Sequence, residues 1–110
     1  MSAVSGLLGL ACRAGQIALG ADIALQEIRA GKAALALLDA GASEGTRKKL
    51  LDACAFRSVP VYMLPENEIS QACGRDGRMA AAVRKGNLAK RMEEVLTEEQ
   101  RSAVNNSRED

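Results

Sequence analysis

Three short stretches of this chain carry residue types that bind phosphate groups. Gly20 interrupts a brief apolar segment and precedes an apolar pattern typical of a helix, so a helix should begin there. Ser43 precedes a second such pattern and is a preferred N-cap residue. A helix N-terminus offers free amide hydrogens and partial positive charge to an anion. The third stretch, the turn 75–78, carries two arginines, whose guanidinium groups suit phosphate.

The residue types needed for catalysis are sparse. The chain has no histidine, so neither a Ser-His nor a Cys-His nucleophile is available. Gly31-Lys32 does not complete a phosphate-binding loop, because position 26 is Gln and an alanine follows the lysine. Asp39 is the one candidate for an acidic pocket at a strand end. We therefore predict a non-enzymatic protein with no catalytic residue.

The cysteines and aromatic residues exclude further kinds of site. Cys12, Cys54 and Cys73 are widely spaced and odd in number, without a Cys-x-x-Cys pair. We expect buried free thiols in a reducing compartment, with no disulfide framework, no metal site and no cofactor. Phe56 and Tyr62 are the only aromatics, so stacking platforms for single-stranded nucleic acid are nearly absent from the sequence.

Length and charge predict one domain with a separate tail. The 110 residues suffice for one core, which we place in residues 1–96, followed by a polar, acidic, frayed tail over 97–110. Residues 93–110 hold six acidic and two basic side chains, a charge of −4, so the total of +1 leaves +5 on residues 1–92. A basic body is compatible with a nucleic-acid partner. No segment suits a membrane span, and the expected location is the cytoplasm.

The hydrophobic pattern alternates between helix and strand along the chain. Helices are expected from the first residues to Gly15 and over 22–31, 43–56, 66–73 and 87–96, and strands over 16–19, 33–38, 59–64 and 79–83. This alternation predicts a layered α/β domain with helices on both faces of a sheet.

Local residue types predict where several helices begin and end. Asp22, Ser43 and Asn87 are the expected N-caps, while Gly31 and Gly74 are expected to stop their helices. If the adjoining strands are neighbours, the Gly20 and Ser43 helix starts and the turn 75–78 share one rim of the sheet. That rim would bind the phosphates of an RNA; alternatively, the three segments are ordinary capped turns.

An ordered series of residues resembles a known family. The series is Gly6-Leu7-Leu8-Gly9-Leu10-Ala11-x-Arg13-Ala14-Gly15, Gly20, Ile28-Arg29-x-Gly31-Lys32-Ala33, Ala42-Ser43-x-x-Thr46-x-Lys48-Lys49, Val59-Pro60-Val61, Ile69-x-x-Ala72-Cys73-Gly74-Arg75-Asp76-x-Arg78 and Asn87-Leu88-Ala89-Lys90. Over residues 5–92 it resembles the bacterial YlxQ group of the kink-turn-binding ribosomal-protein superfamily.

The resemblance implies a three-layer α/β/α sandwich around a small mixed sheet. It also implies binding of structured RNA, of kink-turn or ribosomal type, and partners among ribosomal or translation-factor proteins. The alternating pattern and the absence of histidine predict a monomer. The implied RNA contacts are Gly20, Ala21, Asp22, Ile23, Gln26, Ser43, Arg47, Arg75, Asp76, Gly77 and Arg78.

The chain departs from the family pattern at the implied contacts. The superfamily has Asn or Lys at position 22, Glu or Gln at 23 and a lysine at 26, where this chain has Asp22, Ile23 and Gln26. The loop before the last strand is charged, whereas the family pattern is apolar. A second hypothesis therefore stays open: a protein-interaction module that has lost kink-turn specificity.

Overall fold

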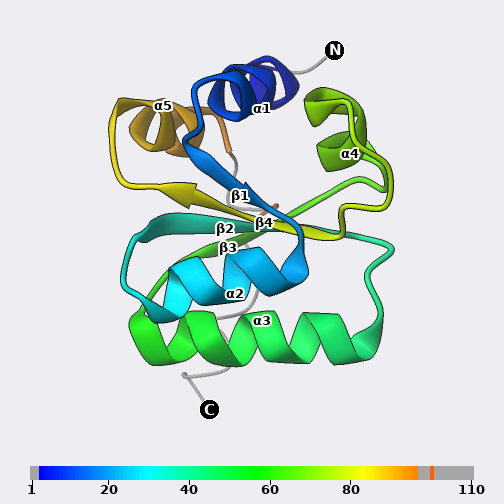
Figure 1. The fold of residues 1–110 in the computed structure, drawn as a ribbon, viewed down its shortest axis with the longest axis vertical. Coiled ribbons are helices and arrows are strands. Elements are labelled where there is room, and N and C mark those ends of the chain that lie inside the picture. The colour runs from blue at the N-terminus through cyan, green and yellow to red at the C-terminus, as the bar shows by residue number, and fades with distance from the viewer. Residues whose placement is uncertain (1–2, 97–99, 101–110) are drawn as a thin grey trace.

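The computed structural model describes residues 3–96 and 100 and contains five helices and four strands in that part of the chain (Figure 1). In chain order the elements are α1 (Ala3–Arg13), β1 (Ile17–Leu19), α2 (Ala21–Arg29), β2 (Ala33–Asp39), α3 (Glu44–Arg57), β3 (Val61–Leu64), α4 (Glu68–Cys73), β4 (Ala80–Arg84) and α5 (Asn87–Val95). Apart from Gln100, the predicted tail lies outside the described residues.

The four strands form one mixed sheet in the order β1-β4-β2-β3. β4 runs antiparallel to both β1 and β2, and β3 runs parallel to β2. Pro60 directly precedes the edge strand β3, as expected of a residue that lacks an amide hydrogen. The predicted strand 33–38 is confirmed as the central strand β2, whose unbroken apolar run is covered on both faces.

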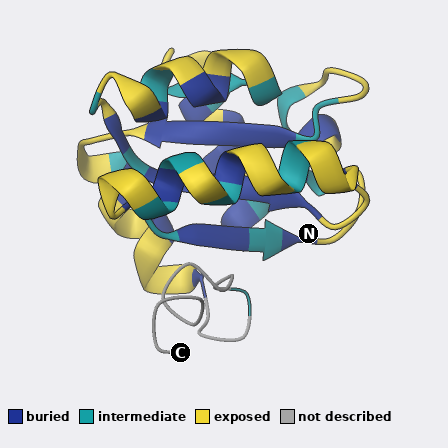
Figure 2. Cartoon of the chain, turned by 90° about the horizontal axis from the view of Figure 1, so that it is seen from below, coloured by how far each residue is buried: buried dark blue, intermediate teal, exposed yellow. Residues whose placement is uncertain are grey.

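The sheet lies between two helical layers (Figure 1), so the predicted α/β/α sandwich is confirmed. Ala36 and Leu38 face α2 and α3, whereas Leu35 and Leu37 face α1, α4 and α5. Figure 2 shows the buried strands between helices whose outer faces are exposed. The alternation of side chains along one strand therefore supplies both halves of the core.

The helix boundaries correct two of the predicted caps. The N-cap of α2 is Gly20, and Asp22 lies inside the first turn. The N-cap of α5 is Gly86, and Asn87 is the first helical residue. In both cases a glycine at positive φ precedes the polar residue, so the backbone turns one or two positions earlier than the side-chain pattern indicates.

The other predicted caps and stops agree with the sequence, and only the start of α4 differs from its prediction. The Ser43 hydroxyl accepts a hydrogen bond from the Thr46 amide (3.2 Å), which confirms it as the N-cap of α3. Gly31 and Gly74 follow the ends of α2 and α4 as predicted. α4 begins at Glu68, two residues later than predicted, after Asn67 in the left-handed region.

Neither a membrane span nor a cluster of metal ligands occurs among the described residues. No helix there has the length and apolar character that crossing a membrane requires. Within the same part of the chain, no three side chains of the His, Cys, Asp or Glu type converge as metal ligands.

Asp39 connects three segments at one end of the sheet. Its side chain is only 1% exposed, and its two carboxylate oxygens accept hydrogen bonds from the amides of Gly41 (2.7 Å) and Asn67 (2.8 Å). Its own amide donates to the carbonyl of Met79 (2.8 Å). The turn into α3, the turn into α4 and the start of β4 are therefore held by one residue.

Replacing Asp39 with alanine should lower the free energy of unfolding by about 3–5 kcal/mol, because two buried amides lose a charged acceptor. Asp39→Asn keeps one carbonyl acceptor and should cost roughly half as much. Urea denaturation followed by circular dichroism measures both values.

The matched control is Asp52→Ala on the exposed face of α3. Asp52 pairs only with the exposed Lys48 (3.1 Å), so its loss should change stability by about 0.5 kcal/mol or less. If Asp39→Ala is as mild as this control, the hydrogen bonds of Asp39 do not hold the rim together.

Candidate nucleic-acid interface

The sheet topology brings the three predicted phosphate-binding segments to one end of the sheet. β1 and β2 end there, and β4, antiparallel to both, begins there. The helix start at Gly20, the helix start at Ser43 and the loop 75–78 therefore share one rim, as expected.

Gly20 and Arg78 lie close together at this rim. The Gly20 amide donates to the carbonyl of Ala80 (2.8 Å), which fixes the start of α2 beside the start of β4. A side-chain Cβ at Gly20 would lie 3.4 Å from a terminal nitrogen of Arg78, and φ there is +112°. The backbone conformation therefore favours glycine, whereas the flexible Arg78 side chain would leave room for a Cβ. Arg78 places its positive charge over the helix start.

Helix α4 holds the loop 75–78 in place. The hydroxyl of the buried Ser70 accepts a hydrogen bond from the Arg78 amide (2.9 Å), and the Ser70 carbonyl accepts one from the Arg75 amide (3.0 Å). Gly77 adopts φ +69°, which allows the tight turn between these anchors. The loop backbone is thus fixed at both ends, while Arg75 itself is exposed.

A pocket of about 490 Å³ lies between this loop and the edge strand β1. We call it the β1-edge pocket; it is lined by Cys12, Arg13, Ile17, Ala18, Leu19, Ile23, Cys73, Arg75, Arg78 and Arg84. Four of these ten residues are arginines, and none of them is acidic. Ile23, on the first turns of α2, is 53% exposed and supplies part of the apolar wall.

Ile23, Arg75 and Arg78 are the predicted contacts that line this pocket, and Gly20 adjoins it through Arg78. The other predicted contacts lie outside the lining: Ala21, Asp22, Gln26, Ser43, Arg47, Asp76 and Gly77. Ala21 packs against the core, and Asp22 and Gln26 are exposed on α2. The pocket therefore unites only part of the predicted set.

Four further predicted contacts lie away from the pocket, two at the start of α3 and two on the other side of the loop 75–78. Arg47 donates a long hydrogen bond (3.5 Å) to the carbonyl of Ala40, and its Nε atom is buried without a partner. Ser43 is engaged in capping. Asp76 and Gly77 line a different hollow, next to Asn67 on the other side of the loop.

Arg13 and Arg84 are pocket residues that the sequence analysis did not identify as contacts. Arg13 is the last residue of α1, and Arg84 is the last residue of β4. Arg84 also donates to the carboxylate of Glu27 (2.8 Å), which orients its guanidinium group beside β1. Their place in the pocket depends on how α1 and β4 pack around β1. The signals in the sequence were that each arginine ends an apolar segment and that Arg13 belongs to the series that resembles the family.

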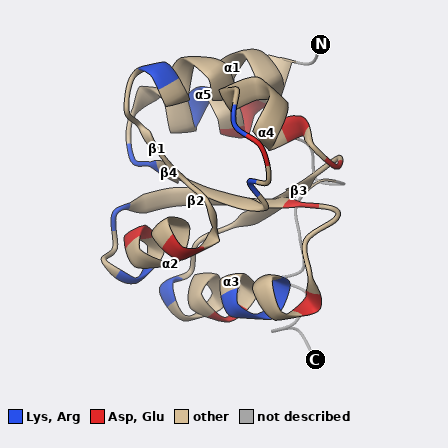
Figure 3. Cartoon of the chain, turned by 45° about the vertical axis from the view of Figure 1, so that its right-hand side comes forward, with Lys and Arg blue, Asp and Glu red and all other residues tan. Residues whose placement is uncertain are grey.

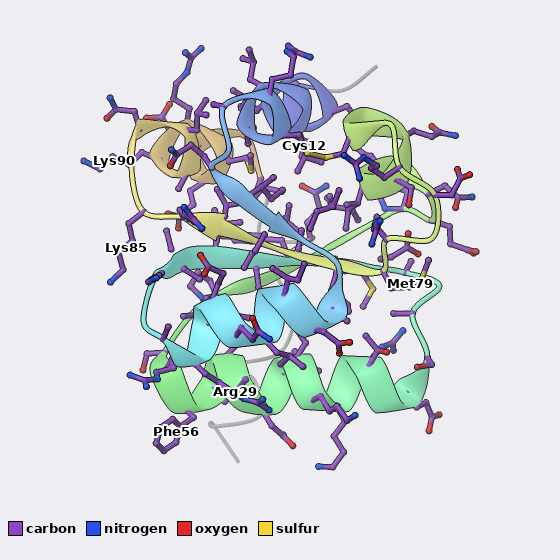
Figure 4. The ribbon with its side chains drawn as sticks, viewed as in Figure 1. Cys12, Arg29, Phe56, Met79, Lys85 and Lys90 are labelled. Carbon is purple, nitrogen blue, oxygen red and sulfur yellow. A yellow bond between two sulfur atoms is a disulfide. The ribbon has the colours of Figure 1, made fainter. Side chains whose placement is uncertain are left out.

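The cysteines correct another expectation. Cys12 and Cys73 form a disulfide between α1 and α4, visible as the yellow bond near Cys12 in Figure 4. They are 61 positions apart in the sequence, but the packing of the two helices brings their Cα atoms to 5.9 Å. Cys54 is a buried free thiol, as expected, and burial raises its pKa to about 12.

The lining of the β1-edge pocket determines which ligands it suits. Clustered arginines attract anions and can grip phosphate oxygens with paired hydrogen bonds. The apolar side chains of Ile17, Leu19 and Ile23 form a surface on which a flat ring can pack. The lining holds neither a histidine nor a carboxylate to transfer a proton or attack a substrate. The arrangement can bind a ligand with phosphates and rings.

Sequence comparison identifies related proteins. A model of the ribosomal protein L7Ae/L30e/S12e/Gadd45 family matches residues 2–93. The RNA-binding protein YlxQ of Bacillus subtilis (strain 168) is 34% identical over 91 residues, which cover 82% of this chain and 91% of that protein. The RNA-binding protein YlxQ of Enterococcus faecium is 35% identical over 91 residues, 82% of this chain and 87% of its own length. The resemblance to the YlxQ group is confirmed.

Solved structures have the same fold. A protein of unknown function from Bacillus halodurans C superposes with a TM-score of 0.81 at 27% identity, over 86% of this chain and 97% of its own. The 15.5kD RNA binding protein of Giardia lamblia superposes with a TM-score of 0.67 at 24% identity, over 84% and 83%. At that identity the second likeness shows the fold alone.

The Cys12–Cys73 disulfide should stabilise the domain. Closing a loop of 61 residues lowers the conformational entropy of the unfolded chain, which stabilises the folded state by about 4 kcal/mol. Replacing both cysteines with serine should lower the free energy of unfolding by an amount of this order, measured in urea without reductant.

Adding dithiothreitol should destabilise the parent protein and leave the double variant unchanged. Thiol titration in denaturant should find one free thiol in the parent, from Cys54, and three after reduction. Three thiols without reduction would contradict the disulfide.

Proposed function

The chain belongs to the ribosomal protein L7Ae/L30e/S12e/Gadd45 family, and from this premise we propose that it is a non-catalytic protein that binds structured RNA through the β1-edge pocket and the start of α2. The observation that carries the proposal is the convergence of Arg13, Arg75, Arg78 and Arg84 on one pocket. The names of the two sequence relatives support RNA as the ligand.

Two parts of the site suit different parts of an RNA, the loop arginines its phosphates and the apolar wall its bases. Arg75 and Arg78 project from a loop that α4 anchors, so they can hold phosphates without ordering the backbone on binding. The apolar wall around Ile23 can take a base that is extruded from a kinked duplex. Phosphate contacts set position, and the extruded base supplies preference for a bent RNA over a regular helix.

We propose a kink-turn-like RNA, in the ribosome or another part of the translation machinery, as the ligand of a monomeric protein. Ribosomal or translation-factor proteins are the proposed neighbours on that RNA. Asp22 stands where the family pattern has Asn or Lys, and Gln26 where it has a lysine, so RNA affinity should be weaker than the family pattern implies. Contacts of the arginines with phosphate groups should restore part of the lost affinity, without base specificity.

One observation favours a second function, that of a protein-interaction module. Ile23 is apolar and 53% exposed beside the exposed Asp22, a combination that a protein partner can cover as well as an RNA. The two functions differ in their response to salt and to RNA shape.

A gel-shift assay distinguishes these functions. A kink-turn duplex should bind more tightly than an unkinked duplex of equal length, because only the kinked RNA offers an extruded base to the pocket. Equal binding of both duplexes would refute kink-turn recognition, and binding of neither would favour the protein-interaction module.

Replacing Arg75 and Arg78 together with alanine should weaken RNA binding by about 2–4 kcal/mol, or roughly 30- to 1000-fold, if each arginine forms a charge-assisted hydrogen bond. The slope of log affinity against log salt should flatten by about 0.7–0.9 for each phosphate group that the variant no longer binds. Fluorescence anisotropy at several salt concentrations measures both effects.

The matched control is Arg91→Ala with Arg101→Ala. It removes the same charge; Arg91 lies on α5 outside the pocket, and Arg101 lies beyond the residues that match the family. If the Arg75/Arg78 variant binds no more weakly than this control, the β1-edge pocket is not the RNA site.

A further inference from the structure

A second group of basic residues lies at the opposite end of the sheet. There α2 and α3 end, β2 begins and β4 ends. We define the distal basic surface as Arg29, Lys32, Arg57 and Lys85, one residue from each of these four segments. Figure 4 shows Arg29 and Lys85 on one side of the molecule and Met79, next to the proposed RNA site, on the other.

Backbone contacts bring these four residues together. The Arg57 guanidinium group donates to the carbonyl of Arg29 and lies 3.9 Å from the position of a Cβ at Gly31. The Lys85 amide donates to the carbonyl of Lys32 (3.3 Å). The grouping therefore follows from the fold, although the residues are up to 56 positions apart in the sequence. All four are exposed.

Little negative charge balances this surface. The part of the chain that the structure describes contains two ion pairs, Lys48–Asp52 and Arg84–Glu27, and neither involves the distal basic surface. Glu27 is the acidic residue nearest the C-terminal end of α2, and it forms its ion pair with Arg84. Figure 3 shows basic residues at the ends of α2, α3 and β4 on this side. A polyanion would meet a positive surface here.

A stabilising role explains the positions of only two of the four residues in the distal basic surface. Arg29 and Arg57 lie in the last turns of their helices, where a positive charge interacts favourably with the helix dipole. Lys32 and Lys85 adjoin β2 and β4, which are the two central strands of the sheet. Lysines protect sheet edges from pairing with other chains, but central strands need no such protection. These two lysines are free to serve a partner.

An aromatic ring stands beside the cluster. Phe56 is 84% exposed, and the guanidinium carbon of Arg57 lies 5.8 Å from its ring centre. An exposed phenylalanine next to positive charge is costly in water but offers a face on which a base can stack. This combination favours a nucleic acid over other polyanions.

We propose that the distal basic surface is a second RNA-contact surface, which binds the phosphate backbone while Phe56 stacks on an unpaired base. The proposal rests on RNA binding by the β1-edge pocket. Arg84 lines that pocket and directly precedes Lys85, so the pocket and the distal basic surface adjoin at the end of β4, while Arg75 and Arg78 lie near its start. The five residues of β4 span roughly 17 Å. One RNA with a long arm can therefore contact both surfaces.

The test uses a kink-turn duplex with one long arm and the variant Lys32→Gln with Lys85→Gln. The salt slope of binding should fall by about 1.4–1.8 and affinity should fall roughly tenfold at 50 mM salt, because two phosphate groups are no longer neutralised. Arg57 is kept, since it caps α2. The variant should fold like the parent protein, which thermal denaturation checks.

Arg91→Gln with Arg101→Gln is the charge-matched control and should bind like the parent. If the Lys32/Lys85 variant behaves like this control while the Arg75/Arg78 variant loses binding, the distal surface is refuted and the proposed function stands. If the parent protein binds no RNA, both proposals fail.

Phe56→Ala tests the stacking contact separately. It should lower affinity roughly fivefold or more for an RNA whose long arm ends in unpaired bases, with the salt slope unchanged, because stacking releases no counterions. An unchanged affinity would exclude Phe56 from the RNA contact.

Discussion

The buried carboxylate of Asp39 is the constraint on which the proposed RNA-binding rim depends. It lies at the end of the central strand β2 and holds the amides of Gly41 and Asn67, while its own amide holds the start of β4 through Met79. The loop 75–78 is anchored to α4 through Ser70, so its position follows indirectly from the same residue. A residue with no direct part in binding thus aligns the loop with the start of α2. The two amide donors allow this carboxylate to be fully buried, whereas the other acidic residues in the described part of the chain lie nearer the surface.

Most of the fold was predictable because its signals are local. The apolar run 33–38, the Ser43 cap and the helix stops at Gly31 and Gly74 each depend on a few neighbouring residues, and the structure confirms them. The caps at Asp22 and Asn87 were wrong because a glycine before each makes the turn first. The Cys12–Cys73 disulfide was missed for a different reason. It depends on the packing of α1 against α4, and no local pattern reports that contact.

The site shows the same limit. The loop arginines were identified from residue type and turn chemistry, and the pocket contains both. Arg13 and Arg84 join them because α1 leads into β1 and the register pairs Ile17 with Val83, which places the end of β4 beside the start of β1. Contacts implied by family resemblance, such as Gln26 and Arg47, lie outside this pocket. Chemistry that is carried by one segment can be predicted from sequence, whereas chemistry assembled from four segments requires the fold.

The central claim is that RNA binds at the β1-edge pocket, and mapping amide chemical shifts during titration with a short kink-turn RNA tests it most directly. The account predicts that the largest shift changes fall in residues 17–23 and 75–78, on both sides of the pocket. A separate groove between α1 and α5 is lined by Leu7, Leu10 and Val95, among others. Smaller changes are expected in this groove and on the outer face of α3. Changes centred on that groove, or no changes under conditions where the RNA is folded, would contradict the account.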